Sequence, residues 1–180
     1  TIPNVNINKY RTGIITVLKK MGANITITNI RLDSNEEIGD LIIKSSQLKP
    51  LNIDGEIIST LIDELPILFI ACAVSSGVSK ISGIEELRYK ESDRIKSMEE
   101  GLTAVGIKVT STIDSIEING GDILGGKINS YGDHRIAMAF AIAALISKKS
   151  ITIIDTKNIS TSFPNFIDLM REQRANIYEL

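Results

Sequence analysis

A single cysteine, Cys72, stands among the 180 residues, so neither an internal disulfide nor a zinc site built from several cysteines can form. Basic and acidic side chains nearly balance, 20 against 22, and the net charge of −2 does not support a strongly basic face for nucleic acid. The longest apolar run, residues 136–146, has 11 residues, well short of the ~20 that span a bilayer. No secretory signal is recognisable. We therefore expect a soluble, cytoplasmic protein that binds neither nucleic acid nor a membrane.

Sequence patterns typical of metal and cofactor sites are also missing. The chain has no metal-ligand spacing, no glycine-rich phosphate loop, no dinucleotide fingerprint and no Ser-His-Asp order. Its glycine pairs, Gly120-Gly121 and Gly125-Gly126, are too few and too scattered for a phosphate loop and fit turns better. We expect no metal and no cofactor. With 43% hydrophobic and 23% charged residues, the composition is that of a globular protein with a real core.

Helical and β-branched segments alternate along the chain. The spacing of apolar residues predicts helices at 11–21, 61–75, 92–105, 133–146 and 166–173. Short β-branched or alternating runs predict strands at 25–30, 40–44, 78–81, 108–112, 115–119 and 151–154. The helices at 61–75 and 133–146 are apolar on nearly all sides, so both should be buried.

These elements repeat. The segment Gly22–Ile25, which follows the first amphipathic helix, recurs as Gly106–Val109 after the later one, and each apolar helix opens with an aspartate, Asp63 or Asp133. The repeating unit is β-α-β-α-β-β, and about two units fit into residues 1–180, with the first entered part-way. An α+β fold of repeated units with buried helices surrounded by sheet is the expected architecture.

The first candidate for chemistry is Asp63, which is followed by Glu64 and Pro66. One interpretation is purely structural, because acidic residues in the first helical turn favour the dipole and proline is tolerated there. In the alternative interpretation, Asp63 projects from the helix start into a cleft and acts as a base.

The second candidate is the charged segment that contains Lys90, Glu91 and Arg94. It could be a solvated loop in which Ser92 or Asp93 caps the next helix. Alternatively, two cations four residues apart across a helix start would bind phosphate or carboxylate. Glu91, which lies between them, would then have an environment suited to proton transfer.

The third candidate is the run Asp133-His134-Arg135 at the start of the second apolar helix. A lone histidine such as His134 is most often a supporting hydrogen-bond partner. Arginine is less frequent here than lysine, 7 against 13, so Arg135 indicates a need for a planar fork that binds carboxylate or phosphate. We expect Asp133 to hold that fork. A fourth segment, residues 160–166, is interpreted as a helix start with hydroxyl caps and a proline.

Six strings, in this order and spacing, resemble the C-terminal part of the EPSP synthase (3-phosphoshikimate 1-carboxyvinyltransferase) family. They are KYRTGIITVLKKMGANITI, DLIIKSSQLKP, IDELPIL, EELRYKESDRI, GDHRIAMAFAIAAL and STSFPNFIDLM. The resemblance covers essentially all 180 residues and rests on independent motifs in register.

This resemblance implies an enolpyruvyl transferase-like fold, in which each of two domains is an inverse α/β barrel of three β-α-β-α-β-β units around buried parallel helices. It further implies that residues 1–180 are part of the C-terminal domain, about two repeat units, and that the N-terminal domain of the same protein is absent. The whole protein is expected to be a monomer.

The reaction implied is transfer of the enolpyruvyl group of phosphoenolpyruvate to the 5-hydroxyl of shikimate 3-phosphate, with release of phosphate, in aromatic amino-acid biosynthesis. Carried over by motif, Asp63 matches the base for that hydroxyl and Glu91 the acid that protonates the methylene carbon. Lys90 matches a lysine beside the shikimate phosphate substrate, and Arg94 and Arg135 match the arginines that clamp phosphoenolpyruvate.

Two alternatives stay open. The related enolpyruvyl transferase that acts on UDP-N-acetylglucosamine shares the fold and the donor, although the YKESDR and DHRIAMAF strings fit it less well. The chain could also be a non-catalytic fragment that keeps the anion pockets. One departure concerns Thr161, because some relatives carry a lysine there that contacts phosphoenolpyruvate.

Overall fold

The computed structural model describes residues 1–178. Its strands are β1 (Ile2–Asn6), β2 (Asn24–Asp33), β3 (Glu36–Lys44), β4 (Asn52–Ile53), β5 (Val78–Ser82), β6 (Lys108–Ser111), β7 (Ser115–Asn119), β8 (Gly126–Asn129) and β9 (Ile151–Ile154). The α-helices are α1 (Gly13–Lys20), α2 (Leu65–Ala73), α3 (Arg94–Ala104), α4 (His134–Ala144), α5 (Ile159–Ser162) and α6 (Phe166–Glu172). Short 3-10 helices are η1 (Gly55–Thr60), η2 (Ile62–Glu64) and η3 (Glu85–Tyr89).

Within the described residues the strands form three sheets, whose order shows the predicted repeat. The four-stranded sheet runs β4-β5-β7-β6, with β4 parallel to β5 and the other pairs antiparallel. In chain order β4-α2-β5-α3-β6-β7 is therefore one complete β-α-β-α-β-β unit. The antiparallel sheet β1-β3-β2 repeats its second half, and the parallel pair β8-β9, joined through α4, repeats its first half. The predicted α+β class of repeated units is confirmed.

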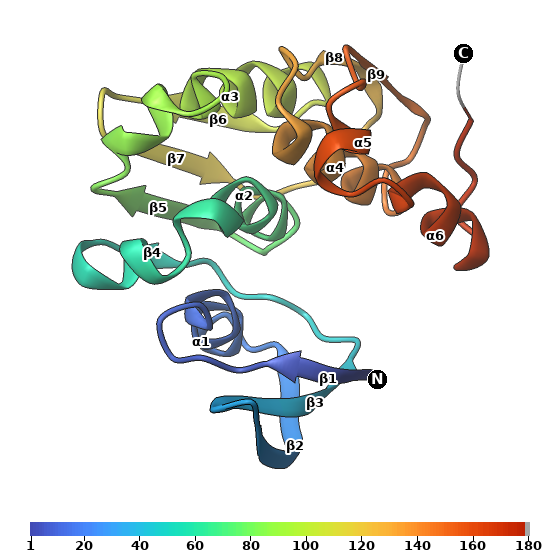
Figure 1. Ribbon diagram of the computed structural model, residues 1–180. Coiled ribbons are helices and arrows are strands. Elements are labelled where there is room, and N and C mark those ends of the chain that lie inside the picture. The colour runs from blue at the N-terminus through green and yellow to red at the C-terminus, as the bar shows by residue number, and fades with distance from the viewer. Residues whose placement is uncertain (179–180) are drawn as a thin grey trace.

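The sheets and helices form two groups in space. In Figure 1, α1 and the β1-β3-β2 sheet lie together at the lower end of the molecule, and the other two sheets lie above them. Helix α2 packs against α4, and α1 contacts η1, which precedes α2 in the chain. The segment before α1 is thereby brought close to the start of α2.

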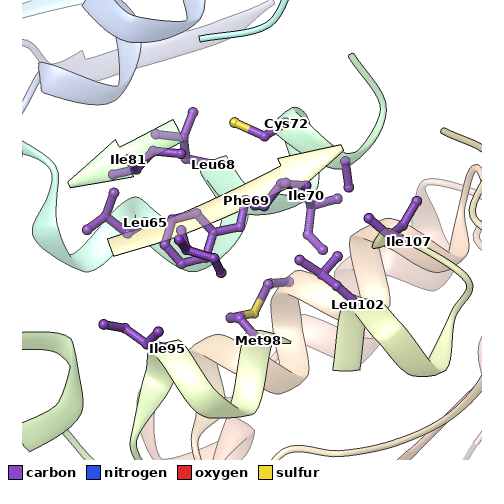
Figure 2. Packing of buried hydrophobic residues seen from close by; sticks show 14 of the residues in the cluster. Leu65, Leu68, Phe69, Ile70, Cys72, Ile81, Ile95, Met98, Leu102 and Ile107 are labelled. Carbon is purple, nitrogen blue, oxygen red and sulfur yellow. The ribbon is translucent and has the colours of Figure 1, made fainter. Parts of the chain in front are cut away.

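Helices α2 and α3 face each other in the hydrophobic core. Leu65, Leu68 and Phe69 of α2 have no exposed surface, nor have Met98 and Leu102 of α3. Figure 2 shows the α3 side chains directed toward Phe69, so the predicted apolar stripe of this helix faces inward. Each such side chain contributes about 1.5–3 kcal/mol by leaving water, which makes this layer the rigid support for the residues at the helix starts.

Helix α4 is apolar on nearly all sides because it is covered on two of them. Ile136, Ala139 and Phe140 belong to the main core that contains α2. Ala137 and Ala141 belong to a second cluster with residues of α5 and α6. The predicted burial of α4 is thus confirmed for its length up to Ala144. The two residues that follow, Leu145 and Ile146, lie outside the helix and are more than half exposed.

Several predicted boundaries differ from the structure. The helix expected from residue 61 begins at Leu65, because Pro66 fits only the first helical turn and residues 62–64 form the separate 3-10 helix η2. Strands β1, β4 and β8 were not predicted, since they are short or carry polar residues. Of the two caps considered for the helix that begins near residue 92, Ser92 and Asp93, the structure has Asp93, whose carboxylate accepts a hydrogen bond from Lys96 N at 3.0 Å.

The hydroxyl caps predicted for residues 160–166 are wrong. Ser160 and Thr161 lie inside α5 and donate to the carbonyls of Lys157 and Asn158, three residues earlier. Helix α6 begins after Asn165, whose side chain makes no capping hydrogen bond. Serine and threonine bind nearby carbonyls as readily as they cap a following helix, so sequence alone does not separate the two roles. Across residues 1–178, every helix is too short or too polar to cross a membrane.

The turn predicted at Gly120-Gly121 is wrong, because these residues lie in the irregular connection between β7 and β8. This connection packs against the carboxyl end of α2 and provides a test of the fold. A Cβ at Gly120 would overlap the carbonyl oxygen of Ser75, whereas nothing lies within 4 Å of a Cβ at Gly121. We expect Gly120→Ala to lower the free energy of unfolding by about 2 kcal/mol or more, because a backbone atom cannot yield. Gly121→Ala is the matched control and should change it by less than about 0.5 kcal/mol. Urea unfolding measures both, and equal effects would contradict this packing.

Candidate active site

A buried ion pair joins the starts of α3 and α4. Arg94, the first residue of α3, places its Nε 2.8 Å from Oδ2 of Asp133, and the side chains are 1% and 0% exposed. Asp133 is the N-cap of α4, and its Oδ1 accepts a hydrogen bond from Arg135 N at 2.9 Å. Ser92 Oγ donates to Oδ2 at 3.2 Å. The Asp133 carboxylate therefore has partners from both sides of the junction: Oδ2 binds the α3 side, and Oδ1 binds Arg135 N of α4.

The ionised state of Asp133 follows from these contacts. Burial by itself raises the pKa of this carboxyl, but the hydrogen bond and charge of Arg94 outweigh it, with help from Arg135 N and Ser92. The net result is a pKa below the ordinary value. A buried charge that is paired on all sides in this way resists protonation near neutral pH.

Arg94 also reaches two other carboxylates. Its Nη2 donates to Oε2 of Glu91 at 2.5 Å, and its Nη1 lies 3.8 Å from Oδ1 of Asp63. Nη1 is buried and has no hydrogen-bond partner among residues 1–178. One guanidinium thus stands between Glu91 and Asp63, with an unused donor on the Asp63 side.

Arg135 holds Asp63 rather than Asp133. Its Nη1 donates to the backbone carbonyl of Asp63 at 2.9 Å, and its Nη2 lies 3.4 Å from Asp63 Oδ2. The prediction that Asp133 holds the Arg135 fork is therefore wrong. The reason is geometric, because an N-cap side chain turns back onto the helix N–H groups. The Asp133 carboxylate accordingly caps Arg135 N and pairs with the guanidinium of Arg94.

Arg11 is a member of this cluster that the sequence analysis did not single out. Its Nη2 donates to Oε1 of Glu64 at 3.1 Å, and its Nη1 lies 3.5 Å from Asp63 Oδ2. It is distant from Asp63 in the sequence, so no local motif indicates the contact. The scarcity of arginine, which marked Arg135, is the one signal that could have found it.

Asp63 is the acid around which the cations gather. Three arginines, Arg11, Arg94 and Arg135, lie within 4 Å of its carboxylate. Within the described part of the chain that carboxylate accepts no hydrogen bond, and the side chain is 26% exposed. An ionised carboxylate held by charge alone, with its lone pairs free and open to solvent, can accept a proton from a bound hydroxyl.

The remaining predicted residues lie at the edge of the cluster. Glu91 is half-exposed and its Oε1 lies 4.0 Å from Nδ1 of the mostly buried His134. Lys90 pairs with Glu86, and no ion pair within residues 1–178 joins it to the arginines. The structure thus brings six of the seven predicted residues into one network and leaves Lys90 beside it.

Residues 158–162 are tied to the same place. Asn158 Nδ2 donates to the carbonyl of Gly132, immediately before Asp133. The hydroxyl of Thr161, where some relatives carry a lysine, donates a hydrogen bond to the backbone carbonyl of Asn158. The short helix α5 is therefore anchored to the start of α4 by Asn158, and Thr161 supplies no charge there.

A pocket of about 140 Å³ opens beside Asp63. It is lined by the charged residues Asp63, Glu64 and Arg135 and by apolar residues of α2 and α4, namely Pro66, Ile67, Met138, Ala139 and Ile142. A larger hollow of about 320 Å³ near β4 and β5 contains Lys80 and Asp54 but none of the clustered arginines. The smaller pocket is therefore the candidate site. No group of three or more His, Cys, Asp and Glu suited to a metal ion occurs within residues 1–178.

The buried pair predicts how stability depends on Asp133. Because its folded pKa is depressed, its contribution is present above the ordinary value of about 4 and is lost as the pH falls through the folded pKa. Asp133→Asn removes the buried carboxylate that pairs with Arg94 Nε and should cost about 3–5 kcal/mol at pH 7. Urea unfolding from pH 7 to pH 3 measures both effects, and the difference between variant and parent should shrink below about pH 4. Asp122→Asn, which breaks only the exposed pair with Lys148, is the control.

Comparison with known proteins assigns the family. Residues 1–170 match the model of the family described as EPSP synthase (3-phosphoshikimate 1-carboxyvinyltransferase). A 3-phosphoshikimate 1-carboxyvinyltransferase from Legionella pneumophila (strain Paris) is 47% identical over 166 residues, which are 92% of this chain and 38% of that protein. The protein of the same name from Alkaliphilus metalliredigens is 48% identical over 168 residues, 93% of this chain and 40% of its own length.

Solved structures agree with these relatives. An EPSP synthase structure from Acinetobacter baumannii has a TM-score of 0.89 and 44% identity, and it covers 95% of this chain and 40% of its own. The enolpyruvyl transferase NikO from Streptomyces tendae has a TM-score of 0.68 at 16% identity, covering 98% of this chain and 39% of its own, which is a likeness of fold alone. The chain spans about two fifths of the length of the curated relatives it matches. On its sequence matches and its fold together, this chain belongs to the EPSP synthase family.

Proposed function

We propose that this chain carries one part of the active site of a 3-phosphoshikimate 1-carboxyvinyltransferase. The reaction transfers the enolpyruvyl group of phosphoenolpyruvate to the 5-hydroxyl of shikimate 3-phosphate and releases phosphate. The observation that carries the proposal is the carboxylate of Asp63, which accepts no hydrogen bond within residues 1–178 and has three arginines around it. Both substrates are polyanions, and clustered guanidinium groups bind such oxygens strongly.

The two acids of the site can divide the proton transfers. The oxygen of the 5-hydroxyl attacks C2 of phosphoenolpyruvate while Asp63 accepts the hydroxyl proton. Glu91 delivers a proton to C3. In the second step Glu91 removes a proton from the new methyl group, the C2–phosphate bond breaks, and the proton held by Asp63 leaves with the phosphate. Arg94 lies between these acids, 2.5 Å from Glu91 Oε2 and 3.8 Å from Asp63 Oδ1, so the two can serve opposite substrates.

Binding of phosphoenolpyruvate is assigned to Arg94 and Arg135. Arg94 keeps one buried donor, Nη1, without a hydrogen-bond partner in the described residues, and Arg135 is one-third exposed beside the pocket. Lys90, next to this network, is free to turn from the exposed Glu86 toward a phosphate. His134 supports Glu91, and Asp133 keeps Arg94 in place. Further contacts to the substrates are assigned to an N-terminal domain of the same protein, since the chain spans about two fifths of its relatives.

Phosphate release tests the proposed activity. We would measure it from phosphoenolpyruvate plus shikimate 3-phosphate with this chain alone and with the chain fused behind the upstream part of the Legionella pneumophila relative. We expect phosphate release from the fusion and none from the isolated chain, because the chain contains only one side of the cleft. Substituting UDP-N-acetylglucosamine as acceptor tests the related transferase activity. A folded fusion that binds both substrates but releases no phosphate would identify a non-catalytic anion-binding fragment.

Loss of the proposed base should stop turnover without unfolding the protein. In the fusion, Asp63→Asn should lower kcat by about 10²–10⁴-fold, because an amide cannot accept the hydroxyl proton. The urea midpoint should stay close to that of the parent, since the Asp63 side chain is partly exposed and its carboxylate accepts no hydrogen bond within residues 1–178. A near-normal kcat would show that another group is the base.

The proposed clamp should distinguish the two substrates. Arg135→Lys keeps the charge but replaces a planar fork by a single ammonium group. We expect the dissociation constant of phosphoenolpyruvate to rise about 10- to 100-fold, the loss of one charge-assisted hydrogen bond. That of shikimate 3-phosphate should change less than about 3-fold. Calorimetric titration of the fusion with each substrate measures both constants, and equal weakening would refute the assignment.

A further inference from the structure

The turn that carries Asp63 needs support from outside. Asp63 is the middle residue of η2, three residues long, in which Glu64 N donates to Leu61 O at 2.9 Å. Such short 3-10 pieces have poor hydrogen-bond geometry and do not hold a side chain rigidly by themselves. On one side of the turn Arg135 Nη1 binds the carbonyl of Asp63. That contact does not reach the following residue, Glu64, so the other side of the turn needs a second contact.

Arg11 supplies the second support. Its guanidinium spans two successive acids, with Nη2 donating to Glu64 Oε1 at 3.1 Å and Nη1 at 3.5 Å from Asp63 Oδ2. The loop behind it is ordered by its own hydrogen bonds, because Asn8 accepts from Tyr10 N at 2.9 Å and from Arg11 N at 2.9 Å. The cation therefore approaches the turn from a fixed base in the β1–α1 part of the chain.

Glu64 explains why the contact matters locally. Its Oε2 is buried and has no hydrogen-bond partner among the described residues, so Arg11 is the group that compensates its charge. Without Arg11, a largely buried carboxylate would remain unpaired, and the turn would have to open to hydrate it. Arg11 itself is 58% exposed, and exposed ion pairs contribute little to global stability. The effect is therefore expected on the placement of Asp63 rather than on unfolding.

We propose that Arg11 is a positioning residue that fixes the Asp63 carboxylate for proton abstraction by clamping η2 through Glu64. The inference rests on the proposed function for its catalytic consequence. Its structural part, the clamp on η2, stands on the contacts of Arg11 and Glu64 alone. It also assigns Glu64 a role separate from that of its neighbour Asp63.

Four variants test the clamp. Arg11→Met and Glu64→Gln each remove one partner, their double variant removes both, and Arg11→Lys restores a charge without the fork. Lys148→Met is the matched control, because it deletes an exposed cation paired with Asp122 near the far end of α4. In the fusion we would measure kcat, the KM of both substrates and the urea midpoint. In the chain itself we would measure hydrogen–deuterium exchange of residues 61–65.

The clamp predicts a specific set of changes. Arg11→Met and Glu64→Gln should each lower kcat about 10- to 100-fold through misplacement of the base, with KM changed less than about 3-fold. The double variant should lose no more than either single variant, since both break one contact. Arg11→Lys should recover part of kcat. Exchange should rise in residues 61–65 of both single variants and stay unchanged in Lys148→Met.

Opposite results would overturn the proposal. Unchanged kcat and exchange in Arg11→Met, or multiplicative losses in the double variant, would show that Arg11 does not act through Glu64. A rise of KM alone would make Arg11 a substrate contact instead. If the parent fusion released no phosphate, the proposed function would fail, and exchange at residues 61–65 would still decide the clamp, supporting it if protection is lost and refuting it if not.

Discussion

The ion pair between Arg94 and Asp133 is fully buried and connects two helices that the chain builds about forty residues apart. Such a pair adds little net stability compared with an apolar pair of the same size, because both charges must leave water. Its consequence is geometric. Asp133 caps α4 while binding Arg94, so the starts of α3 and α4 have one relative position. Arg94 in turn contacts both Glu91 and Asp63 and so sets the distance between their carboxylates.

The apolar helices make this arrangement possible. Leu65 and Phe69 of α2 (Figure 2) and Phe140 of α4 have no exposed surface, so the bodies of both helices are embedded in the core. Arg94 and Arg135 accordingly sit on rigid helices, which is where a site holds its geometry best. The repeat contributes a second effect, because each apolar helix begins after an acid, Asp63 or Asp133, and the arginines of the neighbouring segments meet there.

Local signals predicted much of this structure, and long-range contacts account for what they missed. The buried stripe of α3 and the cap at its start depend on residues within a few positions. The stripe is confirmed, and of the two caps considered the structure has Asp93. The predicted guanidinium partner of Asp133 was wrong. Arg135 is close in sequence and was chosen for that reason, whereas the observed partner, Arg94, lies on another helix. Arg11 escaped notice for the same reason, since the contact with Glu64 exists only after the β1–α1 segment folds against the start of α2. The family motifs identified Asp63 and Glu91 as candidates. That the guanidinium of Arg94 lies between the two carboxylates could be seen only in the folded structure.

A crystal structure of the fusion with shikimate 3-phosphate bound tests the central claim most directly, because it places the acceptor hydroxyl against the proposed base. The account predicts an oxygen of the Asp63 carboxylate within about 2.6–3.2 Å of the 5-hydroxyl, the reach of a general base, with Arg94 still bound to Asp133. A substrate bound with its 5-hydroxyl facing another group, or an Asp63 carboxylate turned away onto Arg11, would contradict it.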